Sequence, residues 1–175
     1  MNKKDIKIFC WLAVVFFAVL KFLNFESAEA LSLAVSGAVL ADWLYDRFLW
    51  RINIFEKTPK IYGTYVATNV SNYNGEKRYT SIVTIKQTLS SISVVETMED
   101  GCCESVTASI AKNTPDGPWF LYYTYLTHPK LSTSDDMHYG TSILHIRGSG
   151  HLEGRYFTNR NHQTAGNVTL NRISK

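Results

Sequence analysis

Two apolar stretches follow one another at the start of the chain, and a pattern with a different period comes after them. The first stretch runs from Ile6 to about Phe25, and the second runs from about Ala28 to Trp50. A helix needs roughly 20 mostly apolar residues to cross a bilayer, and both stretches approach that length. Because only a short turn separates them, the pattern predicts a transmembrane helical hairpin whose outer ends lie on one side of the membrane.

The charges beside the two stretches predict which side that is. The turn carries Glu26 and Glu29, whereas basic residues flank the outer ends: Lys3, Lys4, Lys7, Arg47, Arg51, Lys57 and Lys60. Positive residues stay on the cytoplasmic side, so we expect both termini and the rest of the chain in the cytoplasm. A cleaved secretory signal peptide is the alternative for the first stretch, and the apolar stretch directly after it argues against cleavage.

The second stretch is rich in small residues. Small residues let helix backbones approach closely in lipid, where association depends on packing. We therefore assign helix packing to Ala34, Gly37, Ala38 and Ala41. Asp42 follows them directly, and it either reaches interfacial water or faces a helix seam or pore in an oligomer, since intramembrane carboxylates tend to be functional.

From Lys60 onward the helical period is lost, and apolar residues alternate with polar ones between recurring turn signals. The alternation predicts eight strands, at about 60–69, 78–88, 90–99, 102–112, 118–128, 138–147, 150–159 and 166–174. Antiparallel strands of this number are best closed as an up-and-down, lipocalin-like β-barrel, because closure removes exposed edges. A β-sandwich is the alternative. The expected organisation is a membrane α-hairpin at 1–58 followed by a cytoplasmic all-β barrel at 59–175.

Composition narrows what such a barrel binds. Its acidic and basic residues nearly balance, which argues against a DNA or RNA polymer as partner. Arginines nevertheless gather in the last three strands, and their planar guanidinium groups suit phosphate oxygens. Tyrosines are abundant and offer faces on which bases stack. The combination suits a small nucleotide, although each tyrosine could simply line the barrel and each arginine could simply be solvated.

No catalytic signature accompanies this composition. The histidines lack the spacing of metal ligands, and the chain contains neither a P-loop nor a G-x-S-x-G motif. The three cysteines show no disulfide framework. The sequence therefore predicts a binding protein that is not an enzyme and that uses no metal and no cofactor.

Four segments of the barrel carry a family resemblance: "IYGTY", "WFLYYTYL", "HYGTSILHIRGSGHLEGRYFTNR" and "GNVTLNRI". With the paired N-terminal helices, essentially the whole chain resembles the two-transmembrane, β-barrel effectors of bacterial cyclic-oligonucleotide antiphage defence (CBASS). The resemblance implies a cytoplasmic barrel, anchored in the bacterial inner membrane, that senses a cyclic di- or oligonucleotide made by a partner synthase. It further implies that ligand binding drives homo-oligomerisation, and that the helices then disrupt the lipid bilayer and kill the infected cell.

The candidate ligand contacts come from side-chain chemistry. They are Arg155 and Arg160 for phosphate, Tyr65, Tyr125 and Tyr156 for bases, and Arg78 with Tyr79 at a barrel rim. Other functions stay open at this point: a membrane-tethered lipocalin-like carrier of an apolar ligand, a hairpin toxin or scaffold whose barrel contacts a protein, or a hydrolase acting on nucleotides.

Overall fold

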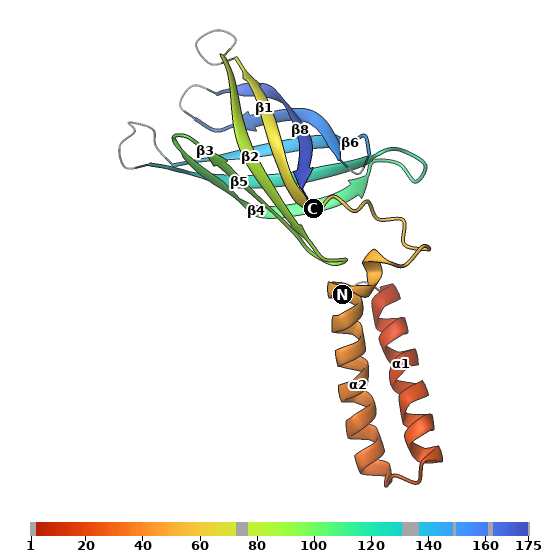
Figure 1. Cartoon of the computed structure of the whole chain (residues 1–175). Helices are drawn as coiled ribbons and strands as arrows, with labels where there is room; N and C mark the ends of the chain where they lie inside the picture. Colours follow the sequence, from red (N-terminus) through yellow and green to blue (C-terminus); the bar gives the residue numbers. More distant parts are fainter. Residues whose placement is uncertain (1–2, 73–76, 131–136, 149, 161–162, 175) are drawn as a thin grey trace. The chain divides into compact units, whose positions relative to one another are not determined.

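The computed structural model describes residues 3–72, 77–130, 137–148, 150–160 and 163–174. The chain divides into two compact units, Met1–Glu56 and Lys57–Lys175. The first unit is helical and the second is built of β-strands (Figure 1).

The helical unit is a hairpin. Helix α1 spans Lys3–Phe22, helix α2 spans Ser27–Arg47, and a short 3-10 helix, η1, covers Leu49–Arg51. Asn24 makes the turn with a φ of 64°, in the left-handed region that asparagine tolerates better than most residues. Lys21 donates from Nζ to the Phe25 carbonyl at 3.1 Å, which satisfies a backbone acceptor in the turn.

The described residues of the hairpin include a helix with the dimensions of a membrane span. Among the described residues, α2 is the one helix long and apolar enough to cross a bilayer. For α1, the apolar segment found among the described residues covers Ala13–Phe22. The predicted pair of helices is confirmed, whereas their insertion into a membrane stays a prediction.

The two helices meet along the small-residue face of α2. Ala30, Ala34 and Ala38 are one turn apart and at most 1% exposed. A Cβ atom added at Gly37 would lie 3.9 Å from the Phe16 ring, so this face packs on α1. The side chains at 41 and 42 are half-buried. The large apolar residues on the other faces are exposed, as expected of a surface that contacts lipid: Leu31, Leu33, Val35, Val39 and Leu40.

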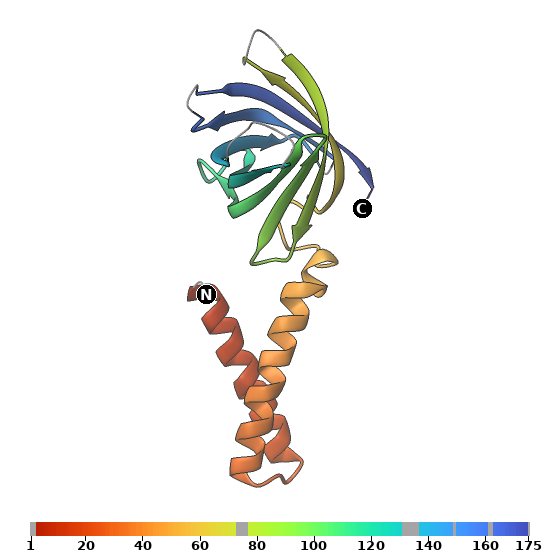
Figure 2. The same cartoon turned by 90° about the vertical axis from the view of Figure 1, so that its left-hand side faces the viewer.

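The second unit is a closed barrel of eight antiparallel strands. Each strand pairs with the next in sequence, and the last pairs with the first, as the ribbons in Figures 1 and 2 show. The strands are β1 Gly63–Ser71, β2 Lys77–Gln87, β3 Ile92–Met98, β4 Gly101–Lys112, β5 Trp119–Pro129, β6 His138–Ile146, β7 His151–Thr158 and β8 Ala165–Ser174. The predicted up-and-down barrel is confirmed and the sandwich is excluded.

The prediction differs from the structure at the strand ends. The first strand begins at Gly63 and not at residue 60, because side-chain groups hold the preceding segment. The amide of Ile61 donates to Oε1 of Gln87 at 2.8 Å. Nε2 of Gln87 in turn donates to the Pro59 carbonyl at 2.8 Å. These bonds replace the strand pairing that the alternation predicted for residues 60–62.

The barrel interior is apolar at one end and polar at the other. Aliphatic side chains fill the end at which residues 59–62 lead into β1: Ile61, Val83, Ile85, Val94, Leu121, Leu144, Leu152 and Leu170. Toward the other end, the buried inward-facing residues include polar side chains: Asn69, Ser71, Ser81, Thr127, His138 and Ser142. Eight strands leave an interior just wide enough for side chains or one small ligand. Side chains fill the aliphatic end, so the space for a ligand lies at the polar end.

Candidate ligand-binding cavity

A cavity of about 500 Å³ occupies the polar end of the barrel interior, and all eight strands contribute to its lining. The aliphatic residues that fill the other end of the barrel are not part of its lining. The lining contains four tyrosines, a carboxyl group on β3 and charged residues at the edge: Tyr79, Tyr123, Tyr125, Tyr156, Glu96, Lys77, Glu99, Asp100 and Arg160.

The tyrosines form an aromatic wall. The rings of Tyr123 and Tyr125, both on β5, lie 5.8 Å apart with their planes tilted by 44°. Across the cavity, the hydroxyl of Tyr79 donates to the hydroxyl of Tyr156 at 3.4 Å. Burial is the largest cause of a raised pKa for Tyr79, Tyr123 and Tyr125. These phenols therefore stay neutral and offer both ring faces and hydroxyl groups to a ligand.

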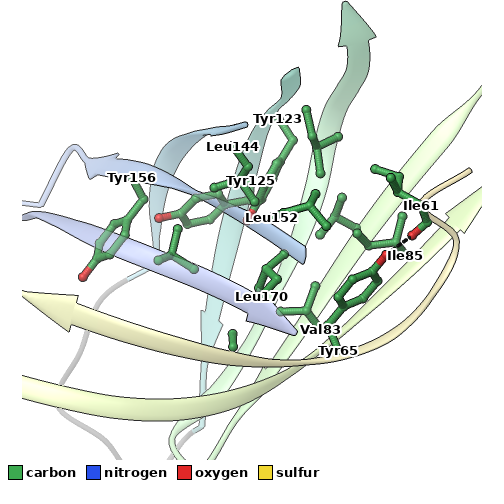
Figure 3. Packing of buried hydrophobic residues seen from close by; sticks show 14 of the residues in the cluster. Ile61, Tyr65, Val83, Ile85, Tyr123, Tyr125, Leu144, Leu152, Tyr156 and Leu170 are labelled. Atoms are coloured by element: carbon green, nitrogen blue, oxygen red, sulfur yellow. Dashed lines mark hydrogen bonds between the residues drawn. The ribbon is translucent and has the colours of Figure 1, made fainter. Parts of the chain in front are cut away.

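Two glycines make room for the aromatic rings. A Cβ atom at Gly140 would lie 2.2 Å from Cζ of Tyr125, and one at Gly166 would lie 2.6 Å from Cε1 of Tyr156. Both rings thus rest directly on the backbone of a neighbouring strand, which fixes how far they reach into the cavity. Figure 3 shows Tyr125 and Tyr156 at the end of the cluster away from Tyr65 and Ile61.

Glu96 places a carboxyl group inside the barrel. Its Oε1 accepts a hydrogen bond from Nδ2 of Asn69 at 3.0 Å and another from the hydroxyl of Ser81. Burial raises the pKa of this carboxyl, and the bonds from Ser81 and Asn69 oppose the rise without cancelling it. The group is held in one position by two side chains and lines the cavity.

Charges of both signs lie at the cavity edge. Lys77 begins β2 and Arg160 follows β7, and both line the cavity. Nε of Arg160 donates to Nδ1 of His138 at 3.5 Å, which directs the guanidinium toward the β6 side. Glu99 and Asp100 occupy the β3–β4 turn. The edge therefore offers two cations to an anionic ligand, and two carboxylates restrict where that ligand's negative charge can lie.

The described lining also contains a cysteine, Cys103, whose thiol is not activated. The thiol of Cys103 lies 3.2 Å from Oγ1 of Thr127, and burial raises its pKa to about 12. A thiol in that state is protonated at neutral pH and is a poor nucleophile. Across the described ranges, no group of three or more His, Cys, Asp or Glu residues is arranged to hold a metal ion.

Four of the predicted ligand contacts lie together in this cavity: Tyr79, Tyr125, Tyr156 and Arg160. The other three lie elsewhere. Tyr65 is at the aliphatic end, bonded to Ile61 and Arg172. Arg78 is exposed, and Arg155 lines a separate outer hollow of about 280 Å³ with Phe157. Their contact with a ligand stays a prediction to which the cavity lends no support.

Sequence reasoning missed the polar groups at the base of the cavity. In the sequence, Glu96 belongs to an acidic group around the β3–β4 turn that also contains Glu99, Asp100 and Glu104. The signal that could have found it is alternation, because Glu96 lies two residues after Val94 and two before Met98, on the inward face of β3. The same reasoning places Asn69 two residues after Ala67 on β1.

A closed barrel with one polar, aromatic-walled cavity defines a receptor for a small ligand. A family model described as "Cap15, cyclic dinucleotide receptor domain" matches residues 56–172. The chain belongs to the Cap15 family of CBASS effectors, which confirms the resemblance drawn from the sequence. It is 30% identical over 179 residues to CD-NTase-associated protein 15 of Staphylococcus schleiferi, covering 96% of this chain and 95% of that protein.

Proposed function

We propose that this chain is an antiphage effector whose barrel binds a cyclic dinucleotide in the cavity at its polar end. The observation that carries the proposal is the aromatic, cation-edged cavity inside a domain that matches a cyclic dinucleotide receptor family. Its volume of about 500 Å³ falls within the roughly 300–1,000 Å³ that small-molecule sites span. The proposal assigns binding to the barrel and assigns it no catalytic step.

The lining supplies the two kinds of contact that a cyclic dinucleotide requires. Bases stack on aromatic side chains, and Tyr125 and Tyr156 present rings that the neighbouring backbone holds in place. Phosphates prefer guanidinium and ammonium groups, which Arg160 and Lys77 supply at the cavity edge. The bases would therefore lie inside the barrel and the phosphates near its edge.

The helical unit would convert binding into membrane damage. We propose that residues 1–58 span the bacterial inner membrane with both termini in the cytoplasm, where the barrel at 59–175 meets a messenger made by a partner synthase. The length and hydropathy of α2 support an anchor of this kind. A ligand shifts an equilibrium only by its differential affinity for two states, so the ligand-bound barrel must favour a self-associated form. Self-association would then bring the helices together, disrupt the bilayer and kill the infected cell.

A carrier of an apolar ligand is less well supported. Such a protein needs a continuous apolar interior, but side chains such as Leu121 and Leu144 already fill the apolar end of this barrel. The space that remains is lined by polar side chains such as Asn69, Glu96 and Thr127, to which an apolar ligand would offer no hydrogen bonds.

The test is direct binding of cyclic dinucleotides to the full chain in detergent micelles. We expect saturable binding of at least one cyclic dinucleotide, and a large loss of affinity in Tyr156→Ala. Tyr139→Ala is the matched control, because Tyr139 is 50% exposed and is not part of the cavity lining. Absence of binding across a full panel, or equal losses in both variants, would refute the proposed site. Release of dye from vesicles carrying the full chain, on addition of the bound ligand, tests the membrane step.

A further inference from the structure

The base of the cavity presents hydrogen-bond acceptors that the protein itself leaves unused. Oε1 of Glu96 already accepts from Asn69 and Ser81. Within the part of the chain that the structure describes, Oε2 of the same carboxyl has no hydrogen-bond partner. Since this atom is also not among the enclosed atoms that lack a partner, it is reached from the cavity that Glu96 lines.

Asn69 adds a second acceptor beside the first. Its Nδ2 donates to Glu96 at 3.0 Å and to Oγ of Ser81 at 3.2 Å, so the amide orientation is fixed by two acceptors. Its Oδ1 has no partner among the described residues, although the side chain is only 3% exposed. Asn69 also lines the cavity. Buried polar groups are normally hydrogen-bonded, so two unused acceptors at the base of a binding cavity call for donors from the ligand.

We infer, on the basis of the proposed function, that Glu96 and Asn69 select a cyclic dinucleotide that carries guanine. The pairing edge of guanine presents two adjacent donors, N1–H and the N2 amino group. Adenine presents a single donor group beside an acceptor nitrogen, and uracil presents one N–H between two carbonyl oxygens. Against a carboxylate and an amide carbonyl, guanine alone of these bases offers donors without an opposing acceptor.

The charges of the cavity favour the same orientation. A phosphate at the base would face the carboxyl group of Glu96, whereas at the edge it meets Lys77 and Arg160. A base at the bottom of the cavity lies instead among the rings of Tyr123 and Tyr125. The guanine therefore enters first and the phosphates follow toward the edge.

The experiment measures binding of c-di-GMP, cGAMP, c-di-AMP and c-di-UMP to the full chain in detergent micelles. We expect the ligands with guanine to bind at least about tenfold more tightly than the others, since leaving a buried polar group without its hydrogen-bond partner costs free energy of that order. Glu96→Gln should lower the affinity for guanine ligands by about 10- to 100-fold. Glu104→Gln is the matched control, because Glu104 is exposed on β4 and should leave every affinity unchanged.

An inosine analogue separates base recognition from a general effect of the substitution. Cyclic di-IMP lacks the N2 amino groups of c-di-GMP and should bind the native protein more weakly than c-di-GMP does. In the Glu96→Gln protein this difference should shrink. Tighter binding of c-di-AMP or c-di-UMP, or an unchanged preference in Glu96→Gln, would overturn the inference and leave the proposed function standing. Failure of all four dinucleotides to bind would overturn both.

Discussion

Arg172 donates two hydrogen bonds to the hydroxyl of Tyr65, from Nε at 3.1 Å and from a terminal guanidinium nitrogen at 2.6 Å. The same terminal nitrogen reaches the Lys60 carbonyl at 3.1 Å, and the Tyr65 hydroxyl donates to the Ile61 carbonyl at 2.6 Å. Tyr65, which was predicted to contact a base, and Arg172 thus hold the segment before β1 against the aliphatic end of the barrel. The ligand cavity lies at the other end.

Removing the Tyr65 hydroxyl tests this structural role. Tyr65→Phe leaves the Ile61 carbonyl and part of the Arg172 guanidinium without their buried partner. We expect the free energy of unfolding to fall by about 1–3 kcal/mol, measured by denaturant titration of the full chain in detergent. Ligand affinity should stay within twofold of the native value, because Tyr65 does not line the cavity. A selective loss of affinity at unchanged stability would instead place Tyr65 in the binding site.

Glu96 makes stability depend on pH with a sign opposite to that of a salt-bridged carboxylate. Its folded-state pKa is raised above the ordinary value of 4.5 because burial disfavours the charge. The folded state therefore holds a proton that the unfolded state has lost, and stability falls as pH rises from about 4.5 through the raised pKa. Glu96→Gln removes this dependence. Its stability relative to the native protein should thus be higher near neutral pH than at pH 4.5.

Melting temperatures of the two proteins over that pH range provide the measurement. Glu153→Gln is the comparison for a carboxyl whose pKa shifts the other way, since hydrogen bonds from Arg147 and His151 lower the pKa of Glu153. A relative stability of Glu96→Gln that does not change with pH would show that Glu96 titrates normally inside the barrel.

The Tyr125 ring packs directly against Gly140. A substitution at Gly140 should therefore change ligand binding by moving that ring. An alanine at 140 would place Cβ within 2.2–2.6 Å of the end of the Tyr125 ring, so the ring must move. Stacking of a base on an aromatic ring contributes roughly 1–3 kcal/mol, so displacement should weaken ligand binding by about tenfold or more. Titration of Gly140→Ala with the bound cyclic dinucleotide measures the effect.

Gly148→Ala is the control for that substitution, because a Cβ atom at Gly148 would meet nothing within 4 Å. It should bind as the native protein does. If Gly140→Ala also binds normally, then the ring of Tyr125 can shift without cost and is not a stacking platform.

The fold could be predicted from the sequence because the patterns that mark each strand lie within the strand itself. Alternation with a period of two marks each strand, and eight such strands in succession favour closure into a barrel. The same alternation shows which side chains of a strand share a face, and the choice of candidate ligand contacts did not take this into account. Arg155 precedes Tyr156 directly, and Arg78 precedes Tyr79, so the members of each pair point to opposite faces of the sheet. Only the tyrosine of each pair lines the cavity.

The position of an inward-facing residue along the barrel axis could not be predicted from alternation. Tyr65 and Tyr125 both point inward, yet one lies at the aliphatic end and the other in the cavity. The difference comes from the register, which pairs Tyr65 with Val83 on β2 and Tyr125 with Gly140 on β6. Register depends on contacts between strands distant in sequence, and no pattern within a single strand states it.

The small-residue face of α2 gives a prediction for the membrane unit. Ala34 is 1% exposed against α1, so a leucine there would overpack the hairpin, at a cost of typically 1–3 kcal/mol. Val35→Leu is the matched control, because Val35 is 43% exposed on the same helix. On the proposed function, Ala34→Leu should bind ligand normally but release little dye from vesicles, whereas Val35→Leu should do both. Equal dye release by the two variants would show that packing of α2 on α1 does not contribute to membrane disruption.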